Sequence, residues 1–187
     1  MKKDIILAGV GGQGVLSIAA VLARAASAAG LNVRQSEVHG MAQRGGAVLS
    51  HLRIADAGIA CDLIPRGGAS LILSMELLEG LRYTAFLAPD GAIVTASEPV
   101  VNIENYPDRE AVVAEIGRFS ASRIVEASAL AKQAGNPRAV NMVMAGAASG
   151  FLPEIPLAVF ESVIRDMFAS RAPAANVEAF RLGRPEG

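Results

Sequence analysis

Residues 9–14, with the sequence GVGGQG, are of a type and spacing that could bind an anion. Gly9, Gly11 and Gly14 match a Gly-x-Gly-x-x-Gly turn, in which missing side chains permit a tight bend and close approach of a ligand. Free N–H groups at the start of a following helix attract negative charge. A bend from strand to helix needs the same glycines without any ligand, so both interpretations stay open. The candidate anion-binding residues are Gly9, Gly11, Gly12, Gln13 and Gly14.

A second chemically capable stretch is residues 37–46, EVHGMAQRGG. We expect a loop here, beside the carboxyl end of a strand, where open α/β sheets bind ligands. Glu37 follows Gly14 by 23 residues, near the spacing of a ribose-binding carboxylate, which makes NAD a candidate ligand. In the alternative interpretation, Glu37, His39 and Arg44 form an internal polar network or face a partner protein.

Other catalytic signatures are missing from the sequence. The single cysteine, Cys61, excludes an iron–sulfur cluster or structural zinc site held by one chain, and its apolar neighbours predict a small buried side chain. Only two histidines are present, and His51 shares a strand with Arg53, which is typical of a structural histidine. We therefore expect no metal site. No serine lies in a Gly-x-Ser-x-Gly elbow, so the usual sign of hydrolase chemistry is absent.

The elements that must position these residues follow from periodicity. An apolar run at 4–8 predicts a buried strand, and the Ala-rich pattern at 13–29 predicts a helix that ends at Gly30 in a left-handed cap. Residues 47–54 alternate and predict a half-buried strand, which a turn at 56–58 joins to an antiparallel partner strand at 59–64. Further strands are predicted at 31–36, 70–74, from Ala92 and at 123–127, and helices at 75–83, 129–134, 138–149 and 157–169.

This order predicts one α/β domain over residues 1–187: a three-layer, Rossmann-like, mostly parallel sheet with helices on both faces and a small antiparallel addition. Hydrophobic residues make up 52% and aromatic residues 4%, which predicts an aliphatic core. Seventeen basic and 18 acidic residues, without a basic run, argue against nucleic acid as a partner. Glycines and Gln13 interrupt the first apolar run, which argues against a signal peptide or membrane span, and we expect a cytoplasmic protein.

Three segments together resemble a known family. Residues 9–14, 37–46 and 50–53 are similar to the gamma-type domain of the pyruvate/2-oxoacid:ferredoxin oxidoreductases, with the closest likeness to the beta subunit of indolepyruvate ferredoxin oxidoreductase. Further matches are residues 135–142, GNPRAVNM, and near the end Asn176, Ala179, Phe180 and Gly183. The resemblance spans almost the whole chain, and the segment 37–46 is more specific than the glycine turn.

The resemblance implies an accessory subunit of an enzyme that oxidatively decarboxylates a 2-oxoacid, such as indolepyruvate or another aryl pyruvate. Coenzyme A takes up the acyl group and ferredoxin accepts the electrons. Thiamine diphosphate and the iron–sulfur clusters are expected on a larger catalytic subunit, so this chain binds no cofactor stably and is inactive alone. A homodimer of the isolated chain is left open.

The resemblance also places a set of residues at the subunit interface or near the active site. Arg44 is the sharpest member, because a guanidinium can pair with a carboxylate or a coenzyme phosphate. Two other functions stay open: a stand-alone NAD-binding dehydrogenase and a non-catalytic binding module. The full set is Glu37, His39, Gly40, Met41, Gln43, Arg44, Gly45, Gly46 and His51.

Overall fold

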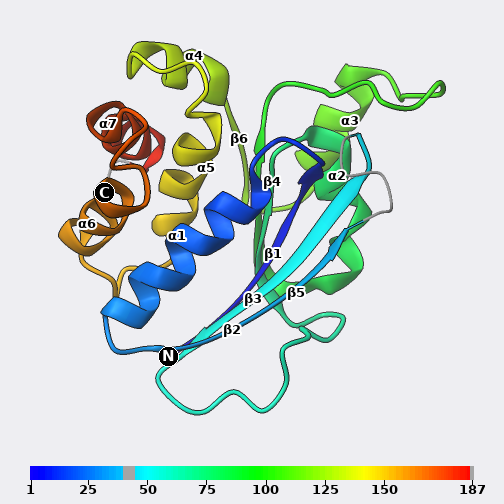
Figure 1. The fold of residues 1–187 in the computed structure, drawn as a ribbon. Coiled ribbons are helices and arrows are strands. Elements are labelled where there is room, and N and C mark those ends of the chain that lie inside the picture. Colours follow the sequence, from blue (N-terminus) through cyan, green and yellow to red (C-terminus); the bar gives the residue numbers. More distant parts are fainter. Residues whose placement is uncertain (40–44, 186–187) are drawn as a thin grey trace.

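A central six-stranded sheet organises the chain (Figure 1). The structure is a computed structural model that describes residues 1–39 and 45–185. The strands follow the order β2-β3-β1-β4-β5-β6 across the sheet. Adjacent strands from β1 to β6 pair in parallel, as the sequence predicts for most of the sheet. The strands are β1 (Lys2–Val10), β2 (Asn32–His39), β3 (Ala47–Ala55), β4 (Ala69–Ser74), β5 (Leu87–Ala96) and β6 (Ser122–Val125).

The antiparallel addition is present, but its pairing differs from the prediction. β3 lies between β1 and β2 and pairs antiparallel with both. Both of its edges are therefore occupied, and residues 59–64 cannot add to it as a partner strand. They form an irregular segment instead, so the prediction of a strand there is wrong.

Helices cover both faces of the sheet, which confirms the three layers (Figure 1). The larger helical layer shares its core with β1 and β4 through side chains such as Ile5 and Leu71. The opposite face is covered by two helices and a short 3₁₀ turn, around Ile6 and Ile72 of the sheet and Leu77 of the first helix. The first layer holds α1 (Val15–Ala28), α4 (Ala127–Gln133), α5 (Val140–Ser149), α6 (Leu157–Met167) and α7 (Pro173–Gly183), and the second α2 (Leu77–Arg82), η1 (Thr84–Phe86) and α3 (Arg109–Ile116).

Small residues allow close packing inside the larger layer. Where α5 and α7 cross, a Cβ added at Gly146 would lie 2.0 Å from the carbonyl oxygen of Phe180. A Cβ at Gly183 would lie 1.9 Å from the carbonyl oxygen of Val143. These two helices can therefore approach so closely only through glycine.

Several boundaries differ from those predicted. α3 and α7 were not expected, and β5 begins at Leu87 rather than Ala92. The Pro-Asp-Gly sequence before Ala92 lies within β5, where the pairing with β4 shifts register. The predicted end of α1 is confirmed, because Gly30 has a φ of 81°. Within the described residues, no helix is both long and apolar enough to cross a membrane.

Candidate functional site

The candidate site lies at the carboxyl ends of β1 and β4. The chain leaves β1 through α1 toward β2, and it leaves β4 through α2 on the other face toward β5. Open α/β sheets bind ligands where successive connections depart in opposite directions like this. The glycine turn at residues 9–14 lies at this position, as the sequence predicts.

Gln13 joins the ends of these two strands. Its side-chain oxygen accepts a hydrogen bond from the Val10 N–H at 2.7 Å, and its amide nitrogen donates to the Met75 carbonyl at 3.0 Å. The Met75 N–H in turn donates to the Ala8 carbonyl at 2.9 Å. Both polar atoms of the Gln13 side chain thus help to shape the turn.

Glycine is required at these positions of the turn for different structural reasons. A Cβ at Gly9 would lie 2.8 Å from Val15 Cγ2 and 3.0 Å from Met75 Cβ. Gly12 has a φ of 100° and nothing nearby, whereas Gly14 has a φ of 83° and would place a Cβ 2.8 Å from the Asn141 amide. The shape of the bend therefore accounts for all three glycines without a ligand.

Backbone hydrogen bonds of Gly11 connect the glycine turn to the end of the segment 37–46. Its N–H donates to the Gly46 carbonyl at 2.8 Å, and the Gly45 N–H donates to the Gly11 carbonyl at 3.4 Å. The Gln13 N–H donates to the Val10 carbonyl at 3.1 Å. With the Val10 N–H, which donates to the Gln13 side chain, three N–H groups of the turn are thus occupied internally, which reduces its capacity for an anion.

The segment 37–46 begins as part of a strand. Glu37 and His39 belong to β2, opposite Ser50 and Val48 of β3, so the prediction of a loop from residue 37 is wrong. The cause is β3, whose return along β2 extends the ladder to His39. The predicted residues Gly40, Met41, Gln43 and Arg44 lie outside the described part of the chain.

The position of Glu37 does not favour a ribose contact. β3 separates β2 from β1, and neighbouring strands lie about 4.8 Å apart, so Glu37 is two strand spacings from β1. Its carboxylate accepts a hydrogen bond from Gln35 Nε2 at 3.4 Å. The spacing of 23 residues between Gly14 and Glu37 does not reveal this separation, because β3 follows β2 in the sequence but lies between β2 and β1 in the sheet.

An open crevice of about 470 Å³ lies beside Gln13, on the side toward β5 and α5. Ser128 donates a hydrogen bond to the Glu98 carboxylate at its rim, and Arg138 precedes α5. Glu98 and Ser128 are not among the residues predicted from sequence, although their place just beyond the carboxyl ends of β5 and β6 is a signal for them. The crevice is lined by Gly12, Gln13, Met75, Glu98, Val100, Ser128, Arg138 and Val140.

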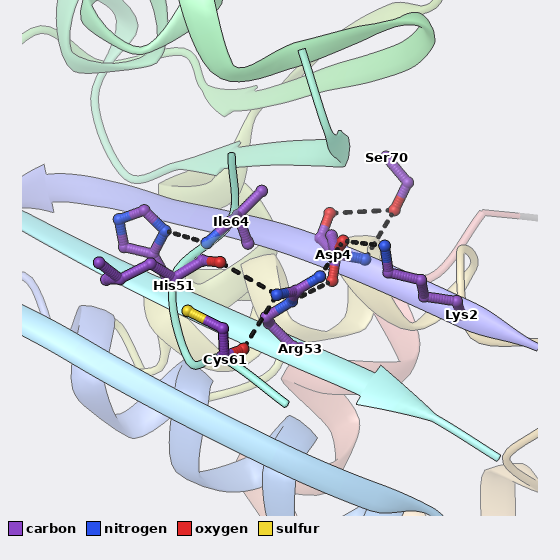
Figure 2. A network of polar contacts seen from close by, with 8 residues as sticks. Lys2, Asp4, His51, Arg53, Cys61, Ile64 and Ser70 are labelled. Carbon is purple, nitrogen blue, oxygen red and sulfur yellow. Dashed lines mark hydrogen bonds and ion pairs between the residues drawn. The ribbon is translucent and has the colours of Figure 1, made fainter. Parts of the chain in front are cut away.

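His51 lies away from this crevice, under the segment 57–64 (Figure 2). It is 5% exposed, and its Nδ1 accepts a hydrogen bond from the Ile64 N–H at 3.1 Å. Burial, followed by the charge of Arg53, lowers the pKa of His51 below 6.5. The geometry is that of a structural histidine, as its place on one strand with Arg53 indicates.

Cys61 belongs to the same segment and is exposed, so the prediction of a buried cysteine is wrong. Its carbonyl oxygen, rather than its side chain, makes the structural contact, accepting a hydrogen bond from Arg53 at 2.9 Å (Figure 2). Among the described residues, no group of three or more His, Cys, Asp or Glu side chains could hold a metal ion.

Comparisons with known proteins agree with this architecture. The family model described as pyruvate ferredoxin/flavodoxin oxidoreductase matches residues 4–186. The indolepyruvate oxidoreductase subunit IorB of Archaeoglobus fulgidus is 35% identical over 98% of this chain and 94% of its own length. The protein of the same name from Pyrococcus horikoshii is 36% identical over 98% of this chain and 95% of its own length.

Solved structures show the same similarity. Pyruvate oxidoreductase subunit PORC of Thermotoga maritima superposes with a TM-score of 0.74 and 25% identity, covering 97% of this chain and 94% of its own. The 2-oxoglutarate:ferredoxin oxidoreductase of Magnetococcus marinus gives a TM-score of 0.75 at 25% identity, covering 97% of this chain and 30% of the larger one. The chain therefore belongs to the pyruvate ferredoxin/flavodoxin oxidoreductase family.

Proposed function

We propose that this chain is an accessory subunit of a multi-subunit 2-oxoacid:ferredoxin oxidoreductase that acts on indolepyruvate or a related aryl pyruvate. The observation that carries the proposal is the end-to-end similarity to IorB proteins, which covers 98% of this chain. The overall reaction would convert the 2-oxoacid and coenzyme A into acyl-CoA and carbon dioxide, with two electrons passing to ferredoxin.

The residues of this chain do not fit the metal cofactors of such an enzyme. An iron–sulfur cluster normally takes four thiolates, and this chain has one cysteine. The described residues also lack a carboxylate or histidine group suited to a metal ion. Thiamine diphosphate and the clusters would therefore belong to a larger catalytic subunit, which supplies the redox chemistry.

The role of this chain would be to complete the surroundings of that active site. The carboxyl ends of β1, β4 and β5 carry the polar crevice, and Gly45 and Gly46 adjoin the glycine turn there. Segment 37–46 would face the catalytic subunit, with Arg44 placed to pair with a carboxylate or a coenzyme phosphate. Exposed Val101 and Ile103, in the segment tied to Gly45 by Asn102, would add apolar contact area.

The test is to purify the chain with its native companions, identify them, and assay ferredoxin reduction against a panel of 2-oxoacids. We expect a larger companion subunit with thiamine diphosphate and clusters, and turnover that is fastest with aryl pyruvates. The chain by itself should give no turnover with any 2-oxoacid. Redox turnover by the purified chain alone would refute the proposal and would favour a stand-alone dehydrogenase.

A further inference from the structure

The outer side of β2 is a free edge of the sheet. β2 begins the strand order, so β3 occupies one of its sides and no strand of the described chain occupies the other (Figure 1). The ladder with β3 runs from Asn32 to His39 without a register shift. At about 3.4 Å per residue, the strand offers an edge roughly 27 Å long, on which every second residue directs its N–H and C=O groups outward.

The usual protections of an edge strand are absent from β2. Its sequence, NVRQSEVH, contains neither proline nor lysine, and its ladder contains no bulge. The two charged side chains, Arg34 and Glu37, point to opposite faces of the sheet rather than along the edge. Val38 is 58% exposed, so apolar surface also remains uncovered on this strand. An edge of this kind readily pairs with a strand of another chain.

We propose that the outer side of β2 pairs antiparallel with β2 of a second copy of this chain, about a two-fold axis. Such an axis stands normal to the sheet and keeps each side chain on its own face, so one residue must lie opposite its own copy. The pairing would join two six-stranded sheets into one. It does not depend on the proposed accessory role.

The side chains of β2 select the residue at the axis. With Arg34 or Glu37 there, each would face its own copy, and like charges directly opposite each other destabilise a sheet. With Gln35 there, the Glu37 carboxylate would lie opposite Val33. Of the four central residues, Ser36 alone avoids both conflicts when it lies at the axis.

With Ser36 at the axis, Gln35 lies opposite Glu37 of the second copy, and Arg34 lies opposite its Val38. The Gln35 amide donates to Glu37 of its own strand at 3.4 Å and has a second N–H for the copy, while a carboxylate accepts several hydrogen bonds. The aliphatic stem of Arg34 would cover the exposed Val38. Both pairs occur twice by symmetry, so the edge is complementary to itself.

The helical layer leaves room for this pairing. α1 packs on β1, β2 and β3, so it lies over β3, the middle strand of the three. In the dimer, β3 and its copy would be three strand spacings apart, about 14 Å, whereas a helix with its side chains is about 10–12 Å across. The two α1 helices would therefore lie side by side without overlap.

Sedimentation equilibrium of the full chain tests the dimer. We expect a reversible equilibrium between monomer and dimer, which Ser36→Arg should weaken about tenfold or more by placing two positive charges at the axis. Ser120→Arg is the matched control, because Ser120 is exposed in the turn before β6, at the opposite edge of the sheet. It should leave the equilibrium unchanged. A wild-type chain that stays monomeric, or equal dimerisation of the two variants, would overturn the proposal.

Disulfide cross-linking tests the register, in a Cys61→Ser background that removes the one native thiol. Ser36→Cys should give a linked dimer, because directly opposite Cα atoms lie about 4.5–5.5 Å apart, within the range of a disulfide. Gln35→Cys should not, since its two Cα atoms would be about 8 Å apart. Circular dichroism checks that each variant is folded. Equal cross-linking of the two cysteine variants, or none in either, would contradict the proposed pairing.

Discussion

Arg53 on β3 donates two hydrogen bonds to the carboxylate of Asp4, the residue directly opposite it on β1. The Nε–Oδ1 and Nη2–Oδ2 distances are 2.8 and 3.0 Å, and Asp4 is 3% exposed. The remaining nitrogen donates to the carbonyls of Cys61 and Leu63, at 2.9 and 3.0 Å (Figure 2). One guanidinium therefore connects two strands and the irregular segment 57–64.

We expect Arg53→Ala to lower the free energy of unfolding by about 3 kcal/mol, because it leaves a buried carboxylate without its main partner. Urea denaturation measures this change. Lys2→Ala is the control, since Lys2 contacts the same carboxylate at 3.0 Å but is 63% exposed. Loss of such an exposed contact should change stability by less than about 1 kcal/mol. Equal losses of unfolding free energy in the two variants would show that the Asp4–Arg53 pair contributes no more to stability than the exposed contact of Lys2.

His51 should make stability depend on pH. Its pKa is lowered in the folded chain, chiefly by burial, whereas the unfolded chain has the ordinary value of 6.5. Below pH 6.5 the unfolded state therefore binds more protons, and stability falls as the pH drops from 6.5 toward the lowered pKa. Above pH 6.5 the contribution of His51 to stability is fully present and constant.

His51→Gln should remove this part of the pH dependence, which urea denaturation between about pH 5 and 8 would detect as a shallower curve than that of the wild type. An NMR titration of the ring protons gives the pKa directly. A pKa of 6.5 or above in the folded chain would contradict the assignment.

The glycines at the crossing of α5 and α7 should not tolerate a methyl group. Gly146→Ala and Gly183→Ala each place a Cβ about 2 Å from a backbone oxygen, which cannot move aside as a flexible side chain can. We expect each to cost about 3 kcal/mol or more. Gly117→Ala is the control: its φ is −64° and the nearest atom would lie 3.4 Å away. Thermal denaturation should leave that variant within about 1 kcal/mol of the wild type. Similar losses in all three variants would refute the close-approach explanation.

Local signals in the sequence were sufficient for the elements near the glycine turn. The apolar run before Gly9 and the left-handed cap at Gly30 depend only on neighbouring residues, so β1 and α1 could be predicted. The position of β3 could not, because alternation identifies a strand and not its partner. Its insertion between β1 and β2 is what leaves residues 59–64 without a ladder to join.

The site shows the same division between local and long-range information. The turn at 9–14 has a recognisable motif, and its location at the strand ends followed from the fold class. Glu98, Ser128 and Arg138 come from three separate segments and share no motif, so only the folded chain brings them to one crevice. Cys61 is exposed in an irregular segment whose carbonyl oxygens bind Arg53, a long-range contact that its apolar neighbours in the sequence do not reveal.

Arg44→Ala should leave the fold intact and lower the turnover of the assembled oxidoreductase, since the proposed partner of this guanidinium lies on another molecule. We expect about a tenfold loss or more, typical for a charged hydrogen bond. Arg66→Ala is the control, because Arg66 is exposed near the amino end of β4, at the opposite edge of the sheet. Unchanged turnover and unchanged assembly of the Arg44 variant would reject the interface assignment.

Glu76, at the start of α2, should determine how firmly the segment 98–107 is held against that helix. Its carboxylate is 1% exposed and accepts hydrogen bonds from the N–H groups of Glu79 and Val100, at 2.9 and 3.3 Å, and from the Tyr106 hydroxyl. Burial and this hydrogen bond raise the pKa of Tyr106, so the phenol stays protonated and continues to donate at neutral pH.

We therefore expect Glu76→Ala to lower the free energy of unfolding by about 3 kcal/mol, because it removes a helix cap and two further bonds of a buried group. Tyr106→Phe removes one bond and should cost about 1 kcal/mol. Both variants should be cleaved faster within residues 98–107 in limited proteolysis, and Glu76→Ala the more so. Glu104→Gln, an exposed change in the same segment, is the matched control and should be cleaved at the wild-type rate. Equal cleavage of the wild type and Glu76→Ala would mean that the other contacts of the segment, such as Asn102 with Gly45, are enough to hold it.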